Sequence, residues 1–388
     1  MIKFLVKLFI KNSEDITNPD VRNNYGQFGG LVGIFLNICL FSGKFIAGLI
    51  VNSIAITADA FNNLSDAGSS IITLIGFKMA AKPADNEHPF GHGRFEYISG
   101  FVISMVILLM SFELGKTSIQ KIFNPTEAAF SIISVSILFV SILVKLWMCF
   151  FNRRLGKIID SPTMKATAMD SLSDVVATST VVVGIFISYL TKLNIDGYLG
   201  IVVAIFIFFT GISTIRETLD KLLGEAPDKE LISQIKGTVL EHKEVIGVHD
   251  IIVHNYGAGQ LIISLHAEVP CDIDILKIHD IIDLIEIELK DKFKCIAVIH
   301  MDPIETNDEK TLETAQKVMS ILKSIDNSIS MHDFRMVVGE THTNLVFDVV
   351  IPFKFRLSDE KLKCEIRERI SCLRPDFYVI VEIDKEPV

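Results

Sequence analysis

Acidic and amide side chains recur at helical spacing inside two otherwise apolar stretches. In SIAITADAFNNLSDAGSS, at 100° per residue, Asp59, Asn62 and Asp66 fall within an arc of about 60°. In SPTMKATAMDSLSDVVATST, Asp170 and Asp174 are four residues apart and share a helix face. Carboxylate and amide oxygens suit hard divalent cations such as Mn²⁺. We therefore expect Asn62, Asp66, Asp170 and Asp174 to bind one ion; the alternative is that they are helix caps or water-facing ends.

Nitrogen and sulfur ligands are missing from these stretches. All ten histidines lie at positions 88 and 92 or beyond 241, and the six cysteines include no CxxC pair. A zinc site would normally include imidazole or thiolate. The sequence therefore favours Mn²⁺ at the carboxylates and indicates buried or idle cysteine thiols in a reducing compartment.

A second group with metal-ligand spacing lies between the two stretches, in KPADNEHPFGHGRFEYISG. Asp85, His88 and His92 are three and four residues apart, and neighbouring glycines permit close approach of the backbone. These three residues are a candidate loop site for a metal ion. The alternative is a turn that only docks the flanking helices.

The elements that must position the carboxylates are membrane helices. The chain of 388 residues is 49% hydrophobic, with a mean hydropathy of +0.44. Six apolar runs are close to the length of about 20 residues that crosses a bilayer. They lie near 30–52, 54–79, 96–118, 129–151, 163–190 and 197–219. The second and fifth runs are the most polar, and these are the runs that carry the carboxylates.

Charge gives the expected orientation. Lys and Arg gather in the amphipathic N-terminal segment 1–28 and in the second and fourth loops, which places both termini in the cytoplasm. Residues 1–224 carry a net charge of +2 and residues 225–388 carry −12. Such an acidic half argues against nucleic-acid binding, which needs a basic face.

The second half reads as a repeat. After the six-helix transmembrane domain, 29–224, the order α-β-β-α-β occurs in 225–305 and again in 306–388, as in tandem ferredoxin-like α+β domains. His249 corresponds to His332 and Val269 to Ile351, at offsets of 83 and 82 residues, which suggests duplication.

We call 225–305 copy one and 306–388 copy two. At matching positions copy one has His249, His266, His279, His300 and Asp302, and copy two has His332, Asp348, Lys361, Glu382 and Asp384. We infer that copy two kept the fold and lost most of any imidazole site.

Three of these segments, ADAFNNLSDAGSS, KPADNEHPFGHGRFE and ATAMDSLSD, resemble the signature segments of the cation diffusion facilitator family, over about 20–305. The resemblance implies a homodimer that exports divalent metal from the cytosol, usually in exchange for protons. It implies a transport site at Asn62, Asp66, Asp170 and Asp174 and a loop site at Asp85, His88 and His92. It also implies cytoplasmic-domain ligands at His249, His266, His279, His300 and Asp302; single core or surface histidines are the alternative there.

Within that family, zinc transporters usually have histidine at the Asp170 position, so the pattern here resembles the manganese branch. Copy two departs from the family's usual single cytoplasmic domain.

The expected function is secondary transport by alternating access, with the ion as cargo and no resident cofactor, in a bacterial plasma membrane. No Walker-type GxxxxGK[ST] and no HExxH occurs, which argues against an ATP-driven pump and an intramembrane metalloenzyme. Export of Zn²⁺, Fe²⁺ or Co²⁺, a metal-sensing membrane protein without transport, and a passive channel are the alternatives.

Overall fold

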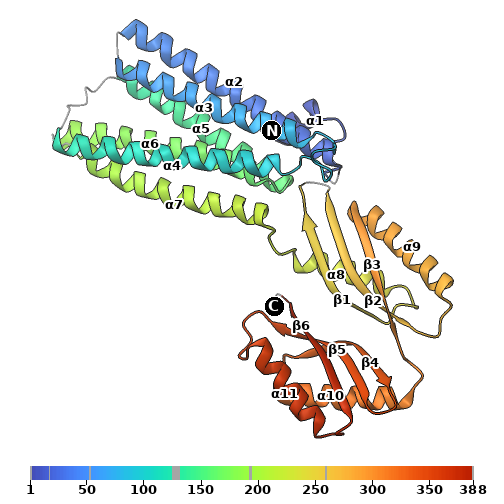
Figure 1. Ribbon diagram of the computed structural model, residues 1–388. Coiled ribbons are helices and arrows are strands. Elements are labelled where there is room, and N and C mark those ends of the chain that lie inside the picture. Colours follow the sequence, from blue (N-terminus) through green and yellow to red (C-terminus); the bar gives the residue numbers. More distant parts are fainter. Residues whose placement is uncertain are drawn as a thin grey trace. The chain divides into compact units, whose positions relative to one another are not determined.

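The computed structural model describes residues 2–16, 18–51, 54–124, 132–191, 195–257 and 260–386 (Figure 1). The chain divides into two compact units. The first comprises Met1–Glu225 with Asn255–Gln260, and the second comprises Ala226–His254 with Leu261–Val388.

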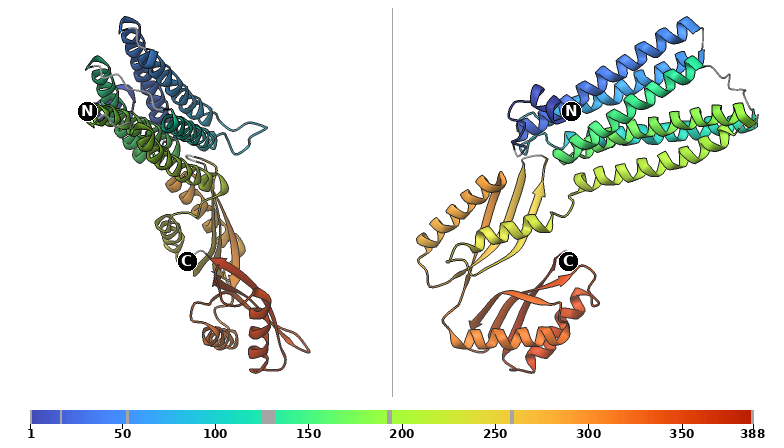
Figure 2. Two further views of the ribbon diagram at one scale, coloured as in Figure 1. Left: turned by 90° about the vertical axis from the view of Figure 1, so that its left-hand side faces the viewer. Right: turned by 180° about the vertical axis from the view of Figure 1, so that it is seen from behind.

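Helices make up the first unit. They are α1 (Ile2–Phe9), α2 (Pro19–Val51), α3 (Ile54–Ala80), α4 (Phe95–Phe123), α5 (Ile132–Ile158), α6 (Pro162–Thr191) and α7 (Asp196–Leu223). Helix α2 packs along α3, α4 along α7, and α5 along α6 (Figure 2). Each of the long helices α2 to α7 overlaps one of the six predicted apolar runs, although α2 begins well before residue 30 and α5 continues beyond residue 151. The expected start of the fourth run, 129–131, lies outside the described residues.

Hydropathy separates these helices into two kinds. Within the described residues, four are long and apolar enough to cross a membrane: Pro19–Ala47, Phe95–Phe123, Val135–Ile158 and Gly197–Leu223. Phe112 and Phe209 on two of them are 73% and 67% exposed, which favours a lipid environment. The described parts of α3 and α6 are more polar, since both carry several Asp, Ser and Thr residues and α3 also carries two Asn residues.

Small residues bring α3 against α2. A Cβ on Gly30 of α2 would lie 3.0 Å from the backbone nitrogen of Leu74 on α3. One turn earlier, a Cβ on Gly26 would overlap the ring of Phe77, which is fully buried. Close helix contact through small residues is common in membrane proteins, and here it fixes the helix that carries Asp66.

A buried ion pair between α2 and α4 also contacts the neighbouring ends of α5 and α6. Arg22 of α2 donates from Nη1 to Oε2 of Glu96 at 2.5 Å and from Nη2 to Oε1 at 3.1 Å. Its Nε also donates to the backbone oxygen of Ile159, at the end of α5, at 2.8 Å. Thr163 of α6 donates to the backbone oxygen of Glu96. Glu96, in α4, is 1% exposed, so this bidentate pair is shielded from water.

Copy one forms an α-β-β-α-β unit. Its elements are α8 (Lys229–Leu240), β1 (Gly247–Asn255), β2 (Leu261–Pro270), α9 (Ile275–Phe293) and β3 (Cys295–Ile304). The sheet order is β1-β2-β3, and β2 pairs with β3 in parallel, with His266 opposite His300. Strand β2 alternates, so that Ile263 and Leu265 enter the core while His266 lies on the other face.

Copy two repeats the order with its own core. Its elements are α10 (Glu309–Ile325), β4 (Ser330–Val338), β5 (Thr343–Pro352), α11 (Asp359–Ser371) and β6 (Phe377–Glu386). Strand β5 pairs with β4 antiparallel and with β6 in parallel. Leu345 and Phe347 of β5 are fully buried, whereas Asp348 lies on the other face.

The two copies share an unusual backbone position. Asp250 in β1 has φ +50° and Asp333 in β4 has φ +53°, and these residues match each other in the repeat. Aspartate is among the few non-glycine residues that adopt this left-handed conformation readily. At Asp333 the β4–β5 register shifts, between His332 and Arg335. Each copy thus bends its first strand directly after a histidine.

Candidate functional site

The carboxylates of α3 and α6 meet around a buried lysine. Nζ of Lys145, on α5, lies 2.6 Å from Oδ2 of Asp66 on α3 and 2.7 Å from Oδ2 of Asp174 on α6. Lys145 and Asp66 are each 4% exposed at the side chain, and Asp174 is 15% exposed. The ammonium group therefore bridges the two helices that the sequence assigns to the transport site.

Asp170 completes the same group. It is 4% exposed and interacts electrostatically with Asp66, Asp174 and Lys145. Its Oδ1 is buried without a hydrogen-bond partner within the described residues. Three carboxylates and one ammonium group leave a formal charge of −2 when all are ionised. A buried negative charge with an unpartnered oxygen is an attractive environment for a cation.

The amide beside these carboxylates is not the one that the spacing suggests. Asn63 is buried and donates from Nδ2 to Oδ2 of Asp66 at 3.2 Å. Asn62 is exposed in this chain. Neighbouring positions on a helix point about 100° apart, and the packing of α3 turns Asn63 inward. The geometry thus brings Asp66, Asp170 and Asp174 together, and a ligand role for Asn62 stays a prediction.

Lys145 is the residue that the sequence reasoning missed. It is a single lysine in a long apolar run, SIISVSILFVSILVKLWMCF. An ionisable residue at membrane depth is costly and commonly functional, so a lysine within this apolar run indicates a functional residue.

The predicted loop residues do cluster. Nδ1 of His88 lies 3.4 Å from Oδ1 of Asp85, and Nε2 of His92 lies 3.4 Å from Oδ2 of the same carboxylate. Nδ1 of His92 lies 3.0 Å from the backbone oxygen of Pro83, which orients the ring. Backbone hydrogen bonds from His88 and Glu87 lower the pKa of Asp85, so it is ionised at neutral pH. The three side chains have suitable donor types and spacing for one metal ion.

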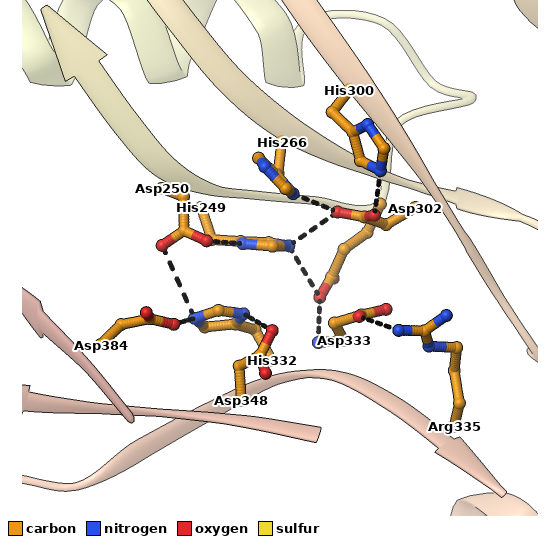
Figure 3. Close-up of polar contacts among 11 residues, drawn as sticks. His249, Asp250, His266, His300, Asp302, His332, Asp333, Arg335, Asp348 and Asp384 are labelled. Carbon is orange, nitrogen blue, oxygen red and sulfur yellow. Dashed lines mark hydrogen bonds and ion pairs between the residues drawn. The ribbon is translucent and has the colours of Figure 1, made fainter. Parts of the chain in front are cut away.

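Four of the five predicted residues in copy one also converge, on Asp302 (Figure 3). Nδ1 of His266 lies 2.9 Å from Oδ2 of Asp302, and Nε2 of His249 lies 3.2 Å from the same oxygen. Nε2 of His300 lies 3.3 Å from Oδ1. His279 is elsewhere, on α9, where it pairs with Asp283 at 3.4 Å and is 61% exposed. The sheet therefore gathers His249, His266, His300 and Asp302 and leaves His279 out.

A proton on His249 stabilises its contacts with the carboxylates of this cluster. Burial disfavours a charge on His249, but hydrogen bonds to Asp250 and Asp302 outweigh that effect and raise its pKa to about 10. Burial also opposes ionisation of Asp302, yet the two histidine rings lower its pKa overall. A metal ion that binds through His249 must therefore displace a proton, as is usual for metal sites.

Comparison with known proteins places this arrangement in a family. Residues 30–223 match the cation efflux transmembrane domain, and residues 227–304 match the cytoplasmic domain of cation efflux proteins. The chain belongs to the cation efflux family. The match to the cytoplasmic domain ends at residue 304, before copy two begins.

Individual relatives of this cation efflux protein are transporters. An uncharacterized transporter of Methanocaldococcus jannaschii is 32% identical over 280 residues, covering 71% of this chain and 97% of that one. The manganese efflux system protein MneS of Bacillus subtilis is 28% identical, covering 72% and 96% of the two chains. The cation-efflux pump FieF of Shigella flexneri is 25% identical, covering 67% and 87%. The family, together with the apolar helices, makes this an integral membrane protein that transports metal cations.

Proposed function

We propose that this protein exports Mn²⁺ from the cytosol in exchange for protons, by alternating access, through a site built on Asp66, Asp170 and Asp174 with Asn62. The observation that carries this proposal is the meeting of three acidic side chains from α3 and α6 around one buried ammonium group. Ionisable side chains at membrane depth are energetically costly, and those that occur there commonly have a function.

Lys145 has a defined role in this mechanism. Its ammonium group supplies the counter-charge for Asp66 and Asp174 when no cargo is bound. An arriving Mn²⁺ competes with that group because both need the same carboxylate oxygens. Cargo binding therefore displaces Nζ of Lys145 from at least one oxygen, and cargo release restores the pair. Protons take part because they neutralise carboxylates that lose a cation in a poorly solvated site.

The donor set favours Mn²⁺ among the divalent ions. All the candidate donors between α3 and α6 are oxygens, and α2 to α7 contain no histidine. Oxygen ligands suit Mn²⁺, whereas imidazole and thiolate favour Zn²⁺ and Cu²⁺. The name of MneS, which is a manganese efflux protein, supports this choice. Export of Zn²⁺, Fe²⁺ or Co²⁺ is the alternative, in line with the broader name of FieF.

We also infer that all six long helices cross the membrane, with both termini in the cytoplasm, and that the protein acts as a homodimer in a bacterial plasma membrane. The two polar helices α3 and α6 are long enough to span and carry the acidic residues between more apolar neighbours. The match to the family's cytoplasmic domain supports a dimer. The α-β-β-α-β order supports a ferredoxin-like fold for each copy. The loop and copy-one clusters are additional ion sites in this proposal.

Purified protein in liposomes tests the transport site. With an imposed pH difference, the wild type should move Mn²⁺, and Asp66→Asn and Asp170→Asn should each lower the rate at least tenfold. Asp160→Asn is the matched control, because Asp160 is 76% exposed and lies outside the acidic group. Full-rate Mn²⁺ transport by both Asp66→Asn and Asp170→Asn would overturn the site.

The same assay separates the rival functions. A passive channel would move Mn²⁺ at a rate independent of the pH difference, and a sensor without transport would move none. An ion panel of Mn²⁺, Zn²⁺, Fe²⁺ and Co²⁺ in competition identifies the cargo.

A further inference from the structure

Two equivalent histidines face each other where copy one meets copy two. The rings of His249 in β1 and His332 in β4 stack with centroids 3.9 Å apart and an angle of 25° between their planes (Figure 3). Their side chains are only 8% and 10% exposed. These two residues match each other in the repeat, so the duplication has brought the same imidazole to both sides of one contact.

Carboxylates from both copies surround the ring of His332. Its Nε2 lies 3.9 Å from Oδ1 of Asp250 in copy one and 3.8 Å from Oδ2 of Asp384 in copy two. Its Nδ1 lies 4.0 Å from Oδ2 of Asp348. Asp250 has a left-handed backbone conformation, and its other oxygen lies 3.3 Å from Nδ1 of His249, also in copy one.

These distances are too long for hydrogen bonds. Neither ring nitrogen of His332 has a hydrogen-bond partner within the described residues, although both are buried. A buried polar atom without a partner is unfavourable and calls for an explanation. Donors that share one tetrahedral ion at about 2.0–2.2 Å stand roughly 3.3–3.6 Å apart. The separations around Nε2 of His332 are a few tenths of an ångström wider than that, and donor atoms of His249, Asp250 and His332 all lie within 4.8 Å of one another.

We propose that a divalent metal ion joins the two copies, bound by Asp250 of copy one and by His332 and Asp384 of copy two, with Nδ1 of His249 as the fourth donor. Two imidazoles and two carboxylates balance the charge of the ion. This mixed donor set favours Zn²⁺ or Co²⁺ over Mn²⁺. The site is separate from the cargo site and goes beyond the proposed transport function.

The remaining nitrogen of His249 supports this assignment. An imidazole that binds the joint ion through Nδ1 keeps its proton on Nε2, which lies 3.2 Å from Oδ2 of Asp302, so the copy-one cluster then binds its ion through His266, His300 and Asp302 without His249. Metal-binding histidines commonly have a carboxylate close to their second N–H. Copy two, which lost most of its imidazoles, therefore contributes the one histidine that a joint site needs.

Metal binding to the full chain in detergent tests the joint site. The cargo site is silenced by Asp170→Asn in every sample, and bound Zn²⁺ is counted after dialysis against a buffered concentration. In that background, His332→Ala and Asp384→Asn should each lose one equivalent of Zn²⁺ per chain. His342→Ala is the matched control, because it removes a histidine of copy two that lies in the β4–β5 connection, and it should retain that equivalent.

Hydrogen exchange supplies a second measurement. Zn²⁺ should slow exchange in peptides from both β1 and β4, and this effect should disappear from both strands in His332→Ala. Unchanged Zn²⁺ binding in both His332→Ala and Asp384→Asn would overturn the proposal. So would a loss of all bound Zn²⁺ in His266→Ala alone, because that result would assign the ion to the copy-one cluster. Asp384→Asn keeps the test valid if His332→Ala fails to fold.

Discussion

Nζ of Lys145 lies 2.6 Å from Oδ2 of Asp66, and both side chains are 4% exposed. The pair crosses from α5 to α3 and continues to Asp174 on α6. The ammonium group of Lys145 thus lies among the carboxylates that we assign to binding of the cargo ion.

Replacement of this lysine should make stability depend on metal. In Lys145→Gln the acidic group loses its counter-charge, and breaking a buried ion pair costs about 3–5 kcal/mol. We expect the free energy of unfolding in EDTA to fall by about that amount. Mn²⁺ at 100 times its dissociation constant should then restore about 2.7 kcal/mol. Thermal unfolding in detergent measures both effects.

Lys116→Gln is the control for this prediction, since Lys116 is 55% exposed and pairs with Glu113 on the same helix. A Lys145→Gln protein that matches the wild type in EDTA would show that the ammonium group does not stabilise the site.

The cargo preference should respond to the ligand type at position 170. Asp170→His replaces a buried carboxylate by an imidazole, so Zn²⁺ should gain on Mn²⁺ by a factor of ten or more in competition uptake. Asp170→Asn is the control, and it should weaken uptake of both ions. An unchanged order of ions in Asp170→His would count against this position as a ligand.

The two neighbouring asparagines of α3 should separate structure from transport. Asn63→Ala removes the hydrogen bond to Asp66, and a hydrogen bond to a charged group contributes about 1.5–3 kcal/mol. We expect this variant to unfold more easily. Asn62→Ala removes an exposed side chain, so it should keep its stability and lose Mn²⁺ transport rate if Asn62 is a ligand. The reverse pattern in the unfolding and uptake assays would contradict this division.

The buried pair of Arg22 and Glu96 should hold the ends of the helices together. Glu96→Gln leaves the Arg22 guanidinium without its carboxylate, and the expected loss is about 3–5 kcal/mol in the free energy of unfolding. Glu217→Gln is a matched control, because Glu217 is 40% exposed and its pair with Lys165 contributes at most about 1 kcal/mol. Equal losses in the two variants would show that burial of the Glu96 pair is irrelevant.

Much of the architecture could be predicted because burial leaves periodic traces in a sequence. The six long helices overlap the apolar runs, and the alternation in β2 and β5 shows which residues enter each core. Convergence of Asp66, Asp170 and Asp174 followed from helical spacing and from the expected pairing of two polar helices.

Contacts between elements are harder to predict from the sequence. A helical wheel cannot tell which of Asn62 and Asn63 faces α5 and α6, because that depends on how α3 is rotated in the bundle. Length and hydropathy predict that the run around Lys145 is a helix, but not that this lysine faces Asp66 and Asp174. The repeat matches His332 to His249 by position, whereas the contact between the two rings arises only from tertiary packing. His279 has the expected residue type but lies on α9, away from the other ligands.

The attachment of Lys145 to its helix also affects the return step of the transport cycle. A carrier that has released its ion must return to the inward-facing state with empty acidic groups in a poorly hydrated interior. The ammonium group of Lys145 stays with the protein and neutralises part of this negative charge, so protons need to neutralise only the remainder before the unloaded carrier resets.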